Sequence, residues 1–182
     1  MNPKHFSFQL ASSLLSIQKE HVESFLKAII NSTVFYRFFS SVKPSCKTAL
    51  ISVSYPTVND KQVSELIEKK IGQLMTFFNE TETVDHEISI DFYTKITKKA
   101  WFSTTEESVC WEKWILQIEL TKAYSQDKQE SLEHAESVLR DTLLKIIKNV
   151  DLYKDHIPLI SSSEPNPFPF KVFPTLKLAF HS

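Results

Sequence analysis

Residues 86–122 read HEISIDFYTKITKKAWFSTTEESVCWEKWILQIELTK, and this stretch decides the fold. Apolar side chains recur at every second position in two runs, which is the period of a half-buried strand. The first run holds Ile88, Ile90, Phe92 and Ile96, and the second holds Trp114, Leu116, Ile118 and Leu120. The pattern predicts two long paired strands in the middle of a sheet, joined by a loop that carries Trp101 and Phe102.

The composition bounds the class of protein. The chain has 182 residues, of which 42% are hydrophobic and 24% charged, as in an ordinary globular domain. This length predicts one domain over residues 1–182, with a core over 1–153 and a short proline-rich strap over 154–182. A net charge of −1 without a basic stripe gives no footprint for nucleic acid.

The sequence also gives expectations about targeting and about the cellular compartment of the protein. The chain has no apolar run near the roughly 18 residues of a membrane span, so we expect no integral membrane association. Polar residues interrupt the N-terminal apolar stretch, so a signal peptide is not expected. Cys46 and Cys110 lie far apart in sequence and are interpreted as free thiols of a reducing, cytoplasmic compartment.

The remaining elements follow from their apolar periodicity. Spacings of three and four predict helices over residues 20–39, about 60–78 and 131–153. Strands are predicted over 6–14 and 49–55, with a loop over 40–47 and prolines that limit the tail to edge strands or a strap. Asn59 or Asp60 can cap the second helix, whose core stripe includes Leu66 and Phe77. This order predicts an α+β fold, with helices covering one face of a largely antiparallel sheet.

The third predicted helix, capped by Ser131, carries more apolar residues than one core-facing stripe needs. The stripe comprises Leu132, Ala135, Leu139, Leu143, Ile146, Ile147, Val150 and Tyr153. Val138 and Leu144 fall off its two edges. Two interpretations stay open: a helix sunk between neighbouring elements of its own fold, or a helix that also forms a protein–protein seam.

Residue patterns typical of catalysis or ligand binding are missing from the sequence. The single glycine, Gly72, excludes glycine-rich phosphate and dinucleotide loops. None of the six histidines pairs with another histidine or a cysteine at metal-ligand spacing. His86 and its acidic neighbours are interpreted as a solvated strand entry, and Glu112 and Glu119 face opposite sides of one strand. We therefore expect no catalytic residue, no cofactor and no metal site.

Trp101 and Phe102 are large apolar groups between lysines and a polar run, where a loop usually faces water. They can fold back as a cap on the core, or protrude as a recognition element. Aromatic side chains are favoured anchors at protein interfaces because they bury much area at low entropic cost. Residue types alone leave both interpretations open.

The segment IDFYTKITKKAWFSTTEESVCWEKWILQIEL, residues 90–120, resembles the signature region of the autophagy-related protein 101 family of HORMA-domain proteins. The resemblance rests on a lysine-rich run, the adjacent Trp101 and Phe102, a short acidic loop, and Trp111 and Trp114 opening the next strand. The order of the elements, with a long third helix before a terminal strap, also fits a HORMA domain. Some members of the family carry a proline between the two aromatics, whereas here they are adjacent.

The resemblance implies a function. Members are non-enzymatic subunits of the autophagy-initiating kinase complex at the phagophore assembly site, and they pair with the HORMA domain of autophagy-related protein 13. The aromatic pair forms their Trp-Phe finger, which recruits downstream factors; by direct match this role falls on Trp101 and Phe102. HORMA domains commonly pair through the third helix, which makes Val138 and Leu144 candidates for the seam. The short, proline-rich tail implies a fixed state that traps no peptide.

The alternative is a small α+β enzyme or ligand-binding domain with an aromatic-rimmed pocket. It predicts a closed cavity near Trp101 that holds convergent polar groups.

Overall fold

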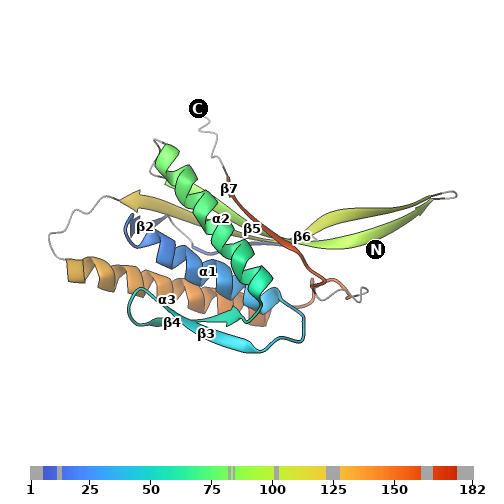
Figure 1. Cartoon of the computed structure of the whole chain (residues 1–182), viewed down its shortest axis with the longest axis horizontal. Helices are drawn as coiled ribbons and strands as arrows, with labels where there is room; N and C mark the ends of the chain where they lie inside the picture. Colours follow the sequence, from blue (N-terminus) through green and yellow to red (C-terminus); the bar gives the residue numbers. More distant parts are fainter. Residues whose placement is uncertain are drawn as a thin grey trace.

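The computed structural model describes residues 6–11, 14–81, 83, 85–100, 103–121, 128–160 and 166–175. A five-stranded sheet, a two-stranded hairpin and three helices make up this part of the chain (Figure 1). The elements are β1 Phe6–Gln9, β2 Leu15–Gln18, α1 Val22–Arg37, β3 Pro44–Ala49, β4 Val53–Val58, α2 Lys61–Glu80, β5 Asp85–Ala100, β6 Ser103–Thr121, α3 Lys128–Leu152 and β7 Phe170–Thr175.

The β5–β6 pair forms the centre of the large sheet, as its alternating sequence predicts. The strand order is β1-β6-β5-β7, and β2 also pairs with β6. β5 is antiparallel to both β6 and β7, whereas β1 and β2 run parallel to β6. The single strand predicted over 6–14 is therefore wrong: two short strands lie along one edge of β6, and the first stops bonding to β6 after Leu10, whose backbone N–H donates to the carbonyl oxygen of Ile115 at 2.8 Å.

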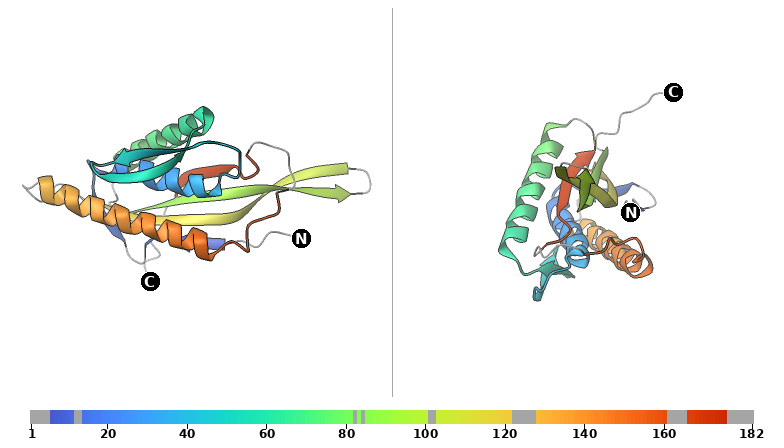
Figure 2. Two further views of the ribbon diagram at one scale, coloured as in Figure 1. Left: turned by 90° about the horizontal axis from the view of Figure 1, so that it is seen from below. Right: turned by 90° about the vertical axis from the view of Figure 1, so that its right-hand side faces the viewer.

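The three helices lie on the same side of the sheet (Figure 2). They cover the alternate sheet positions Ile88, Ile90, Phe92, Trp114, Leu116 and Ile118, all of which are buried. α1 is buried around most of its circumference because it contacts α2, α3 and the β3–β4 hairpin as well as the sheet side of the core. This arrangement confirms the predicted α+β class with a mostly antiparallel sheet.

α2 begins where the sequence predicts. The Asp60 side chain accepts a hydrogen bond of 2.9 Å from the backbone N–H of Val63, which satisfies one of the free donors of the first turn. Its buried stripe is narrower than predicted, because α2 lies at the outer edge of the helical layer. Leu66 is 38% exposed, so its predicted burial is wrong, whereas Phe77 is half-buried and packs against the core.

The region around β3 and β4 differs from its prediction of a loop followed by one strand. Residues 44–58 form an antiparallel hairpin in which Ala49 pairs with Val53. Leu50 turns the chain in the left-handed region, with φ 55°, and donates its backbone N–H to Ser24 Oγ at 2.9 Å. Non-glycine residues rarely adopt this conformation, so nothing in the sequence marked the turn.

α3 starts at Lys128, so Ser131 is not its cap but a buried residue whose Oγ lies 3.3 Å from His21 Nε2. Ala135, Leu139, Leu143 and Ile146 are buried as predicted. Ile147 and Tyr153 are 44% and 43% exposed, which corrects their assignment to the core stripe. The C-terminal part returns as β7, an edge strand on β5, as its prolines predict.

Candidate interaction surfaces

The β5–β6 hairpin projects well beyond the rest of the domain (Figures 1 and 2). Among the described residues, β7 pairs with β5 as far as Phe92, and β1 pairs with β6 from Glu112 onward. Past these points the two strands pair with each other from Tyr93–Cys110 to Ala100–Ser103. At about 3.3 Å per residue, this projecting part is about 25 Å long.

Trp101 and Phe102 lie outside the described residues. Their sequence neighbours Ala100 and Ser103 are the last cross-strand pair of the hairpin. The predicted finger residues therefore fall, in sequence, between the ends of two strands that have already left the body of the domain.

Most of the described side chains on the projecting hairpin are polar. Thr97, Thr105, Glu106 and Ser108 are exposed, and Ile96 is half-buried. The predicted burial of Ile96 with the core face of β5 is corrected, because this residue lies past the point where helices and flanking strands cover the sheet. An arm with such sides adds little to the domain's own core.

The two candidates on α3 have different environments. Leu144 is 53% exposed near the middle of the outward face, close to the exposed Ile147. Val138 lies about 120° away around the helix and is partly buried against the core. Val138 also lines a cavity of about 200 Å³, with Leu10, Ala11, Leu15, Asp141, Thr142 and Lys145. The structure therefore does not bring Val138 and Leu144 onto one face.

A polar clamp joins α3 to the turn between β3 and β4. Glu136 Oε1 accepts hydrogen bonds from the backbone N–H groups of Ile51 and Ser52, at 3.1 and 2.7 Å. Glu136 Oε2 accepts from Ser52 Oγ at 2.6 Å and pairs with Arg140 Nη2 at 2.8 Å. The Ser52 hydrogen bonds are the largest influence that lowers the pKa of Glu136. The clamp holds Ile51, which is 71% exposed, beside the outward face of α3.

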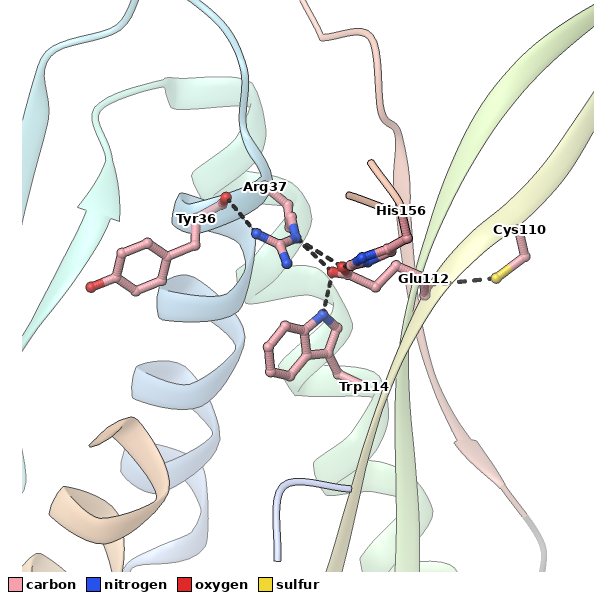
Figure 3. Close-up of polar contacts among 6 residues, drawn as sticks. All are labelled: Tyr36, Arg37, Cys110, Glu112, Trp114 and His156. Atoms are coloured by element: carbon pink, nitrogen blue, oxygen red, sulfur yellow. Dashed lines mark hydrogen bonds and ion pairs between the residues drawn. The ribbon is translucent and has the colours of Figure 1, made fainter. Parts of the chain in front are cut away.

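A buried charged network lies at the base of the hairpin (Figure 3). Glu112 is fully buried, and both of its oxygens accept from Arg37 Nε, at 2.8 and 2.9 Å. His156 Nε2 lies 2.6 Å from Glu112 Oε2, and Trp114 Nε1 donates to Oε1 at 2.5 Å. A carboxylate can only accept, so His156 Nε2 carries the hydrogen. Burial opposes ionisation of Glu112, but the bonds from His156 and Arg37 outweigh it and lower its pKa.

This network could not be predicted from the sequence. Arg37, Glu112 and His156 come from three distant parts of the chain, and none belongs to a motif. A weak signal was present: Glu112 stands between Trp111 and Trp114, two aromatics predicted to pack in the sheet, and all three are fully buried. An acidic residue in such surroundings needs a cationic partner.

His86 corrects another prediction. It is 5% exposed rather than solvated, and its ring lies 4.5 Å from that of Phe78 and 6.0 Å from that of Phe77. Its Nε2 is buried without a hydrogen-bond partner, and burial lowers the pKa of the ring. The imidazole is therefore neutral in the folded protein at neutral pH.

This burial predicts a pH-dependent stability. A histidine whose folded pKa lies below its unfolded value of 6.5 binds more protons when unfolded, so stability is complete above pH 6.5 and falls as the pH decreases. We expect His86→Phe to be at least as stable at pH 7, and its advantage over the unchanged protein to grow at pH 5.5. Urea unfolding at both pH values measures this difference. An advantage that stays constant between them would contradict the assigned environment.

The fold and these surfaces define a HORMA-type α+β domain with a projecting two-stranded arm. The family model of autophagy-related protein 101 matches residues 14–164, so the chain belongs to the autophagy-related protein 101 family. An autophagy-related protein 101 of Arabidopsis thaliana is 23% identical over 168 residues, which cover 81% of this chain and 78% of the relative. The chain is thus an autophagy-related protein.

In the part of the chain that the structure describes, no helix is long and apolar enough to cross a membrane. Within the same residues, no three histidine, cysteine, aspartate or glutamate side chains gather in a way that could hold a metal ion. Cys46 is exposed, Cys110 is half-buried, and both are free thiols.

Proposed function

We propose that the chain is a non-enzymatic adaptor subunit of the autophagy-initiating kinase complex. In this role it supports autophagosome formation in the cytoplasm, at the phagophore assembly site. Membership of the autophagy-related protein 101 family supports the part of this proposal that concerns autophagy. The observation that carries the adaptor role is the hairpin that continues past both flanking strands to the Ala100–Ser103 pair.

Recruitment is assigned to the end of that hairpin. Trp101 and Phe102 follow Ala100 and precede Ser103, so an arm with polar sides leads to two adjacent aromatics in the sequence. Aromatic anchors carry a large share of binding energy at interfaces. A narrow arm that ends in such residues suits insertion into a pocket of a downstream autophagy factor. Exchange of both aromatics for alanine should abolish capture of that factor and preserve pairing.

Pairing is assigned to α3 and the neighbouring clamped turn. The partner is the HORMA domain of autophagy-related protein 13, which the pairing stabilises. Leu144, Ile147 and Ile51 are exposed, and Arg140, whose side chain is 52% exposed, lies one turn before Leu144 and donates to Ser52 Oγ, next to Ile51. Apolar residues around an arginine resemble the composition of protein interfaces. Val138 does not lie on the outward face of α3, so its contribution to pairing is assigned to the cavity that it lines.

The pairing predicts a strong effect of Leu144→Asp. A carboxylate buried without a partner is costly, so we expect affinity for the HORMA domain of autophagy-related protein 13 to fall about 100-fold, or about 3 kcal/mol. Calorimetric titration of the purified domains measures it. Leu66→Asp, at a comparably exposed leucine of α2, is the matched control and should leave affinity unchanged. Equal affinities for both variants would exclude Leu144 from the seam.

The enzyme or ligand-binding alternative places its pocket near Trp101, which lies outside the described residues. The cavity that Val138 lines, in the described part of the chain, gives this alternative little support. Its volume of about 200 Å³ is below the roughly 300–1,000 Å³ of typical ligand pockets. Four of its lining residues are apolar, and the hydroxyl of Thr142 already donates to the backbone carbonyl of Val138 at 2.8 Å. The cavity suits a supporting role beside α3 better than substrate binding.

A further inference from the structure

The point where the hairpin leaves the sheet coincides with an irregularity in its pairing. Phe92 pairs with Glu112 and Tyr93 pairs with Cys110, so Trp111 is an extra residue on β6. Such a bulge bends the strand and increases its twist, and bulges often redirect the part of a strand that follows. Trp111 and Glu112 are both fully buried, although they are consecutive in a strand whose side chains normally alternate between faces.

The aromatic side of the bulge is packed by two segments outside the hairpin. The Trp111 ring lies 4.9 Å from that of Phe168, which precedes β7, and 5.6 Å from that of His156, which follows α3. The His156 ring is itself stacked on Phe6 of β1 at 4.3 Å. The base of the hairpin is thus enclosed by the segments after α3 and before β7, together with β1.

The charged side of the bulge is fixed by directional bonds. Glu112 is held by Arg37 at the end of α1 and by His156, and Cys110 Sγ donates to the backbone oxygen of Glu112 at 3.6 Å. Arg37 Nη2 is buried without a hydrogen-bond partner, so the network is not an optimal way to fill this space. Apolar side chains commonly replace a buried ion pair without loss of stability. A charged network here therefore suggests a role in geometry rather than in stability alone.

We propose that the Arg37–Glu112–His156 network and the Trp111 bulge set the direction in which the β5–β6 hairpin leaves the domain. Arg37, Glu112 and His156 are then positioning residues for recruitment, a consequence that rests on the proposed function. The direction itself does not depend on it. A hairpin about 25 Å long that turns by about 20° moves its end by about 9 Å, which is more than the depth of a side-chain pocket.

The direction can be measured with two spin labels and pulsed electron paramagnetic resonance. One label is attached to the exposed native Cys46 on β3 and the other to Thr105→Cys on the hairpin, in a chain where Cys110→Ser keeps a hydrogen-bond donor at the base. The unchanged network should give one narrow distance distribution. The triple variant Arg37→Met, Glu112→Leu, His156→Phe should fold, melt at a similar temperature, and give a distribution displaced or broadened by about 6 Å, the movement that a turn of about 20° produces at Thr105, about 17 Å along the arm.

Binding supplies the second readout. We expect the triple variant to capture the downstream factor about tenfold less tightly, because a displaced hairpin end reaches its pocket in only a fraction of molecules. A narrow, unshifted distribution in the triple variant would overturn the inference, and so would a broad distribution with the network intact. The distribution with the network intact is measured without the triple variant. The inference can therefore still be contradicted if the triple variant does not fold. If the distances change as expected but Trp101→Ala with Phe102→Ala leaves capture intact, the proposed recruitment fails while the positioning role stands.

Discussion

Glu112→Ala is expected to lower the free energy of unfolding by about 3–5 kcal/mol, the usual cost of removing one partner from a buried ion pair. The substitution leaves the Arg37 guanidinium charged and 1% exposed, and it removes the acceptor for His156 and Trp114. Chemical denaturation followed by tryptophan fluorescence measures the loss. In a chain of 182 residues it should appear as a fall of about 10 °C in melting temperature.

The control for this prediction is Glu106→Ala, at an exposed glutamate of the same strand. It should change the free energy of unfolding by no more than about 0.5 kcal/mol. The pKa of Glu112 is lowered in the folded protein, so its contribution is present above the ordinary carboxyl pKa and is lost as the pH falls through the lowered value. Glu112→Ala should therefore lose less stability on acidification than the unchanged chain. Equal destabilisation by both alanines would contradict the network.

Trp101→Ala with Phe102→Ala is expected to abolish recruitment while the domain stays folded and paired. Each aromatic anchor contributes about 2–4 kcal/mol where it fills a partner pocket, so the double change removes most of a micromolar affinity. The flanking pair Ala100–Ser103 belongs to the β5–β6 ladder. The backbone hydrogen bonds of this ladder do not require the side chains of Trp101 and Phe102. Autophagic flux in cells that express only the variant measures the loss of function.

Thermal melting separates this result from a structural one. If the two aromatics were a cap on the core, their removal would cost about 3–5 kcal/mol each and the melting temperature would fall by many degrees. The matched control is Thr97→Ala with Thr105→Ala, at exposed positions on both strands of the hairpin. The control should keep both flux and melting temperature. An unfolded double aromatic variant would place the pair in the core and end the recruitment proposal.

The periodic elements could be predicted from the sequence because one physical rule dominates each of them. The strands β5 and β6 have alternating apolar residues over long runs, and α2 has a cap at Asp60 followed by a helical stripe. These are local patterns, and burial of one face is sufficient to specify them. The residues of the finger could be selected only through the family resemblance, since their types allow a core cap equally well.

The missed features depend on contacts between distant parts of the chain. The β3–β4 turn has no glycine; Leu50 adopts its left-handed conformation where Ser24 and Glu136 bind the backbone of the turn. The buried state of Glu112 depends on Arg37 and His156, which are remote in sequence. His86 is buried because the end of α2 covers it, which no strand pattern indicates.

The most direct test of the adaptor role is purification of the native complex from the cells in which this protein occurs, with the mass of the intact assembly measured. We expect stoichiometric recovery of one copy of autophagy-related protein 13 for each copy of this chain, lost on Leu144→Asp and retained on Leu66→Asp. Recovery of the chain as a lone monomer, or with a bound metabolite in place of a second HORMA domain, would contradict the adaptor role.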